Sequence, residues 1–180
     1  MNELHNRCLD TFPEWLRALN ADAGEIAKVL ASTDAPEVTR RYVAGGLNYL
    51  FKSLDLIPDG IEDLGFLDDA FVIRVAAALA LKEAPEARGH FPVLGRLADE
   101  SKLVAELLGK DHARLESYVK TLTRGVARGR TVDEILQKDD VRSAFLLEVS
   151  GWANSYETPS FSRDEKNIVK LQAFLAAKLP

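Results

Sequence analysis

Apolar residues recur along this chain with the spacing of an α-helix, and this periodicity constrains its fold more than any other feature. They return every three or four positions, which places them on one helix face. The clearest stripes are Leu94/Leu97/Val104/Leu107/Leu108, Leu115/Val119/Leu122/Val126 and Ile168/Leu171/Phe174/Leu175. Because no segment alternates cleanly between hairpin turns, the sequence predicts no strand. It predicts an all-α fold, a compact bundle of about eight or nine helices.

Capping residues and prolines set the expected helix boundaries. An acceptor side chain three residues ahead of a glutamate marks several predicted helix starts. The predicted helices are 3–9, 12–19, 23–32, 36–53, 69–84, 92–108, 111–128, 132–155 and 163–178, with a break near 139–140 as an alternative. We expect a single domain over residues 1–180, and two subdomains divided near 85–92 are the alternative.

The composition, 47% hydrophobic and 28% charged over 180 residues, is that of a soluble globular protein. The longest apolar stretch, Ala70–Leu81, is shorter than the roughly 20 residues that cross a bilayer. The single Cys8 forms no disulfide within the chain, and we find no signal peptide, so we expect a cytoplasmic protein. A net charge of −5 disfavours nucleic acid as a partner.

One acidic segment stands apart from the helical pattern. No lysine or arginine occurs between Lys52 and Arg74, and the segment holds all of the acidic excess of the chain. Its acids are Asp55, Asp59, Glu62, Asp63, Asp68 and Asp69. Pro58, Gly60 and Gly65 interrupt any regular helix here. We therefore expect an irregular acidic connector between helices 36–53 and 69–84.

The stretch from Tyr49 to Asp69, YLFKSLDLIPDGIEDLGFLDD, resembles the signature of the YkvA-like family, domain of unknown function 1232. The resemblance covers about residues 40–80. The residues that carry the structural motif are Tyr49, Asp55, Pro58, Asp59, Gly65, Asp68 and Asp69. The resemblance implies a short helical hairpin and a membrane association of some members, and it supplies no catalytic residues. Lys52-Ser53, Gly60 and Glu62-Asp63 depart from the family pattern, and the segment is more acidic as a result.

The acids of this connector allow two interpretations. In the first they are structural, because carboxylates cap helix starts and complete turns. In the second they form a divalent-cation site, because hard cations prefer carboxylate oxygens. The candidate metal ligands are Asp55, Asp59, Asp68 and Asp69. No other cofactor is predicted.

Two further features concern surfaces and packing. Lys120, Arg124 and Arg128 are spaced by four, which predicts a shared basic face on helix 111–128. This face is either solvated or a patch for phosphate, anionic lipid or an acidic partner. The glycine pair Gly45-Gly46 predicts a close approach of helix 36–53 to the alanine-rich side of helix 69–84.

The sequence therefore predicts a non-catalytic binding or scaffold module with no catalytic residues. It would present the connector, the basic face, or both to a protein partner. The first alternative is a module peripheral to the membrane, with a membrane surface as partner. The second is a divalent-cation-dependent enzyme that uses the connector carboxylates. The partner and the oligomeric state stay open.

Overall fold

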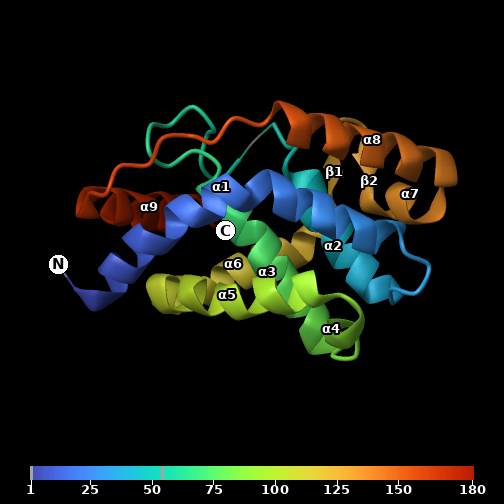
Figure 1. The fold of residues 1–180 in the computed structure, drawn as a ribbon, viewed down its shortest axis with the longest axis horizontal. Coiled ribbons are helices and arrows are strands. Elements are labelled where there is room, and N and C mark those ends of the chain that lie inside the picture. Colours follow the sequence, from blue (N-terminus) through green and yellow to red (C-terminus); the bar gives the residue numbers. More distant parts are fainter. Residues whose placement is uncertain (1, 54) are drawn as a thin grey trace.

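The computed structural model describes residues 2–53 and 55–180. Leu54, an apolar residue of the predicted connector, lies outside the described residues, as does Met1. Helices dominate the chain, and the prediction of an all-α fold is confirmed (Figure 1).

The elements follow one another as a series of helices interrupted by one described hairpin. The first helices are α1 (Glu3–Ala31), α2 (Glu37–Tyr49), α3 (Leu67–Glu83), α4 (Ala87–His90) and α5 (Pro92–Leu108). A 3-10 turn, η1 (Gly109–Asp111), leads into α6 (His112–Leu122), and the antiparallel strands β1 (Val126–Ala127) and β2 (Arg130–Thr131) follow. The chain then continues through α7 (Val132–Gln137), α8 (Asp139–Ser155) and α9 (Glu165–Lys178).

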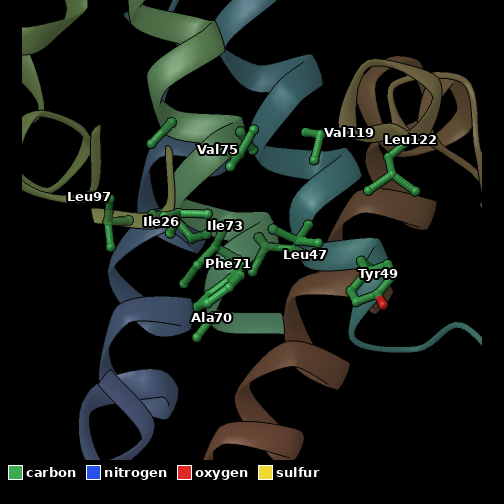
Figure 2. Close-up of a cluster of buried hydrophobic side chains, with 14 of the residues drawn as sticks. Ile26, Leu47, Tyr49, Ala70, Phe71, Ile73, Val75, Leu97, Val119 and Leu122 are labelled. Atoms are coloured by element: carbon green, nitrogen blue, oxygen red, sulfur yellow. The ribbon is translucent and has the colours of Figure 1, made fainter. Parts of the chain in front are cut away.

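The central helix is α3, which is apolar nearly all the way round and is therefore buried on every side. It packs against α1, α2, α5 and α6. Figure 2 shows this core, in which Phe71 of α3 lies among Ile26 of α1, Leu47 of α2, Leu97 of α5 and Val119 of α6. Within the described residues, no helix combines the length and the apolarity needed to cross a bilayer.

The glycine pair of α2 allows this helix to lie close to two neighbours. A Cβ atom added at Gly46 would be 3.4 Å from the Cβ of Ala76 in α3, so the predicted approach to the alanine-rich side of α3 is confirmed. A Cβ atom added at Gly45 would be 2.9 Å from the carbonyl oxygen of Leu122 in α6, a contact the sequence did not predict. The helix α2 is thereby wedged between α3 and α6.

The N-terminal part of the chain differs from the prediction. The predicted helices 3–9, 12–19 and 23–32 are one continuous helix, α1, with Pro13 inside it. A proline within a helix removes one backbone hydrogen bond. Here Phe12, Trp15, Leu16 and Leu19 are all buried along the same face, and their burial outweighs that loss.

The prediction of a helix over residues 111–128 is also wrong beyond Leu122. The helix α6 ends at Leu122, and the chain forms the hairpin of β1 and β2, although no strand was predicted. The turn of this hairpin holds Arg128 and Gly129 at positive φ, 49° and 76°. Thr131 then caps the start of α7 and forms a capping box with Glu134. The alternative break near 139–140 is confirmed, because α7 ends at Gln137 and α8 begins at Asp139.

A buried ion network joins α1, α3 and α5. The Arg74 guanidinium is fully buried, lies 3.2 Å from Glu100 and 3.5 Å from Asp22, and covers the Trp15 ring at 4.0 Å. Arg96 contacts Asp22 at 2.5 Å. Asp22 therefore lies between two guanidinium groups, those of Arg74 and Arg96.

Candidate metal centre

The acidic connector, residues 50–66, begins directly after Tyr49, and this tyrosine holds it in place. The Tyr49 hydroxyl donates to Oδ2 of Asp68 at 2.5 Å and accepts the backbone N–H of Leu56 at 2.8 Å. Its ring is fully buried, and its oxygen points toward the connector in Figure 2. The end of α2, the middle of the connector and the start of α3 therefore meet at one hydroxyl group.

The second half of the connector makes a very tight turn. A Cβ atom added at Gly65 would be only 2.2 Å from the carbonyl oxygen of Asp59, so glycine is needed for this close approach. The next residue, Phe66, has a left-handed φ of 68° and precedes α3. This turn carries Asp59 to the start of α3.

Three of the four predicted metal ligands come together as a result. One carboxylate oxygen each of Asp59, Asp68 and Asp69 lies within 4.8 Å of the others. Asp68 and Asp69 are 0% and 2% exposed, whereas Asp59 lies at the surface. Asp55, the fourth predicted ligand, lies outside this group of oxygens but close enough for its charge to act on Asp69.

The two carboxylate oxygens of Asp68 have different surroundings. Its Oδ2 accepts hydrogen bonds from the Tyr49 hydroxyl and, at 3.3 Å, from the backbone N–H of Ile57. Its Oδ1 is buried and has no hydrogen-bond partner among the described residues, and the same holds for Oδ2 of Asp69 and Oδ1 of Asp55. Oδ2 of Asp68 therefore has the structural role that the first interpretation predicts. The unpaired oxygens of the three carboxylates could bind a further group.

The crowding of carboxylates in a buried place raises their pKa values. Burial, with Asp59 and Asp68 nearby, raises the pKa of Asp55 to about 7. Burial raises the pKa of Asp68 to about 6, against the opposing effect of its hydrogen bond from Tyr49. The pKa of Asp69 is raised well above its usual value by burial and by the neighbouring Asp68. Burial and mutual repulsion therefore favour the protonated form of these carboxyl groups over the charged form.

A segment from the far end of the chain closes one side of the connector. Residues 156–164, here called the strap, run from α8 to α9 beside the connector (Figure 1). The Ser162 N–H and hydroxyl both donate to Asp63 at 2.8 Å, and the Tyr156 ring packs edge-on against Phe66. Nothing in the local sequence pairs residues 99 positions apart, so sequence reasoning missed these contacts.

The predicted basic face does not form as one helical stripe. Lys120 lies on α6, but Arg124 and Arg128 lie beyond its end at Leu122. Arg128, in the hairpin turn, forms an ion pair with Glu148 and covers the Phe51 ring at 4.9 Å. The prediction failed because the helix pattern continued past Leu122, whereas the chain turns back at Arg128 and Gly129.

The comparisons with known proteins bear on the connector alone. No curated protein and no solved structure matches the chain. A match to a family does occur. It begins within α2, runs through the whole connector and ends in the first half of α3, so that it includes Tyr49 and the three clustered carboxylates. Residues 39–74 match the family described as protein of unknown function (DUF1232), which confirms the resemblance of this segment to the YkvA-like family.

Proposed function

We propose that this chain is a non-catalytic binding module whose connector takes up a divalent cation at Asp59, Asp68 and Asp69. Two observations carry the proposal. One carboxylate oxygen each of Asp59, Asp68 and Asp69 lies within 4.8 Å of the others, and Asp68 and Asp69 each have a buried oxygen without a hydrogen-bond partner among the described residues, Oδ1 and Oδ2 respectively. A buried polar atom without a partner costs about 1–3 kcal/mol, and more when it is charged. A bound cation would remove this cost.

The chemistry of the ligands indicates which cation to expect. All three side chains supply oxygen, which hard cations prefer, whereas zinc favours nitrogen and sulfur ligands. Ca²⁺ takes about six to eight oxygen ligands, whereas Mg²⁺ is commonly held by one or two carboxylates and keeps several water molecules. Three clustered carboxylates are few for Ca²⁺, and they suit Mg²⁺ or its analogue Mn²⁺ with water at the remaining positions.

The position of the ligands indicates what the cation would do. Asp59 belongs to the connector, and the other two ligands belong to the first turn of α3. A cation between them would fix the connector against α3. It would bind Asp68 through Oδ1, because Oδ2 already accepts from the Tyr49 hydroxyl. The cation would therefore hold the connector in one conformation, which a binding partner could recognise.

Calorimetric titration with Mg²⁺, Mn²⁺ and Ca²⁺ tests the proposal, together with thermal unfolding in the same buffers. A cation at 100 times its Kd stabilises the folded state by ~2.7 kcal/mol, which corresponds to roughly 5–10 °C for a chain of this size. Asp59→Asn is the test variant because Asp59 lies at the surface, so the fold should tolerate the change. Glu62→Gln is the matched control, an exposed connector acid outside the cluster.

We expect heat and a rise in melting temperature for wild type and Glu62→Gln, and neither for Asp59→Asn. Electron paramagnetic resonance of added Mn²⁺ gives a direct count of bound ions. The proposal is wrong if wild type shows no bound Mn²⁺ and no melting shift at millimolar cation. It is also wrong if Asp59→Asn binds as well as wild type.

A further inference from the structure

An open pocket of about 720 Å³ lies directly beside the carboxylate cluster. Cavities of this size hold small molecules rather than single ions. The pocket is formed by the start of the connector on one side and by the β1–β2 hairpin on the other. Its lining includes Phe51, Lys52, Ser53, Asp59, Arg128 and Gly129. Asp59 thus belongs both to the pocket wall and to the carboxylate cluster.

The residues that line the pocket together with Asp59 include two cationic side chains, Lys52 and Arg128. Lys52 has no ion-pair partner among the described residues, and its ammonium lies 5.9 Å from the Tyr118 ring centroid. Arg128 forms an ion pair with Glu148, but Glu148 also pairs with Arg130. One carboxylate therefore faces two guanidinium groups, and positive charge remains for a ligand.

Arg128 is also held in position before any ligand arrives. Its guanidinium lies over the Phe51 ring, and its backbone is fixed in the turn of the hairpin. A guanidinium group offers its N–H donors in a planar fork that matches the oxygens of phosphate, and little side-chain freedom is lost when it is already stacked. The pocket lining therefore contains one pre-positioned guanidinium group, that of Arg128, together with Lys52 and with Asp59 of the candidate cation site.

We propose that this pocket binds a small phosphate-bearing molecule whose phosphate bridges the cation at Asp59 and the side chains of Lys52 and Arg128. This inference rests on the cation site proposed above. Mg²⁺ sites in proteins commonly combine carboxylates with phosphate oxygens of the ligand, and the remaining positions are filled by water. Without the cation, Asp59 repels the phosphate, so binding of the two must be coupled.

Mn²⁺ binding in the absence and presence of a phosphate probe measures this coupling. The probes are inorganic phosphate, ADP and vesicles containing phosphatidic acid, which distinguish a free anion, a nucleotide and a lipid headgroup. Calorimetry gives the Kd of Mn²⁺ for each condition, and the reverse titration gives the Kd of the probe with and without Mn²⁺. The two coupling factors must agree, because linkage between binding equilibria is reciprocal.

Lys52→Met and Arg128→Met are the test variants, and Lys120→Met is the matched control. Lys120 is an exposed lysine of α6 that does not line the pocket. We expect at least one soluble or vesicle probe to tighten Mn²⁺ binding by about tenfold in wild type and in Lys120→Met. Both test variants should bind Mn²⁺ alone as wild type does and should lose most of the coupling.

Each other outcome has a definite meaning. If wild type binds Mn²⁺ but no probe changes its Kd, the phosphate pocket is wrong and the cation site stands. If a probe binds equally well without Mn²⁺, or if the test variants keep full coupling, the bridging arrangement is wrong. If neither Mn²⁺ nor any probe binds, the cation site and the phosphate pocket fail together.

Discussion

The phenolic hydroxyl of Tyr49 lies 2.5 Å from Oδ2 of Asp68, so the last residue of α2 holds the second residue of α3. The same hydroxyl accepts the N–H of Leu56. Because the ring is buried, no water can replace either hydrogen bond without rearrangement. This one group joins the end of α2, the middle of the connector and the start of α3.

Removal of that hydroxyl should be costly. Tyr49→Phe leaves a buried N–H and a buried carboxylate oxygen without their partner, and we expect a loss of about 1–3 kcal/mol in the free energy of unfolding. Tyr118→Phe is the control, because its ring packs edge-on against Tyr49 and its hydroxyl makes no hydrogen bond among the described residues. Urea unfolding followed by circular dichroism measures both. Equal stability of the two variants would contradict this role.

The turn at Gly65 provides a second prediction. Gly65→Ala places a Cβ atom against the Asp59 carbonyl oxygen, so Asp59 must move. We expect a loss of about 1–3 kcal/mol in the free energy of unfolding, as for other overpacked sites, together with weaker Mn²⁺ binding. Gly60→Ala is the control, since nothing lies within 4 Å of its added Cβ atom. A Gly65→Ala protein with unchanged stability and unchanged Mn²⁺ affinity would refute the close approach.

The free energy of unfolding should depend on pH through two carboxyl groups, Asp55 of the connector and Asp68 of α3. Burial raises the pKa of Asp55 to about 7 and that of Asp68 to about 6, above the values of about 4 in an unfolded chain. The folded state therefore binds more protons than the unfolded state between about pH 4 and pH 7, and these groups lower the stability as the pH rises through this window. Below the window the contribution is constant.

Unfolding in urea with EDTA, at several values between pH 5 and pH 8, measures this effect. Asp55→Asn is the comparison, because the amide keeps the shape and cannot ionise. We expect the free energy of unfolding of wild type to fall more steeply with pH than that of the variant. Mg²⁺ added in place of EDTA should reduce the fall at pH 8. Parallel pH profiles for wild type and variant would show that Asp55 titrates normally.

The buried ion network gives a fourth prediction. Arg74→Met leaves Asp22 and Glu100 without a buried partner, and we expect a loss of about 3–5 kcal/mol, as is typical when one member of a buried pair is removed. Arg88→Met is the control, because Arg88 and Asp99 form an exposed pair and such pairs contribute little. Thermal unfolding of both variants is the measurement. A mild effect of Arg74→Met would mean that Arg96 alone can neutralise Asp22.

The fold was predictable from the sequence where local signals and burial agree. Periodic leucines predicted α5 and α9 within one or two residues, and the crowding of acids in the connector made Asp59, Asp68 and Asp69 candidate ligands of one site, together with Asp55. The length of α1 was not predictable, because Pro13 and the nearby capping pairs favour a break that packing overrides. The hairpin around Arg128 was missed because two-residue strands are too short to show alternation.

Long-range partners limited the prediction of the site. The burial of Arg74 depends on Asp22 and Glu100, which lie far away in the sequence, and the connector depends equally on the strap. No spacing rule links Asp63 to Ser162. The pocket between Lys52 and Arg128 likewise forms only when the hairpin folds back onto the start of the connector.

The contact between Asp63 and Ser162 also sets an order of events during synthesis. Both hydrogen bonds that Asp63 accepts come from Ser162, which is synthesised 99 residues later. While the nascent chain ends before the strap, α2 and α3 can pair, but the connector lacks the segment that closes one side of it. A newly made chain therefore completes the neighbourhood of the carboxylate cluster only after the strap has been synthesised.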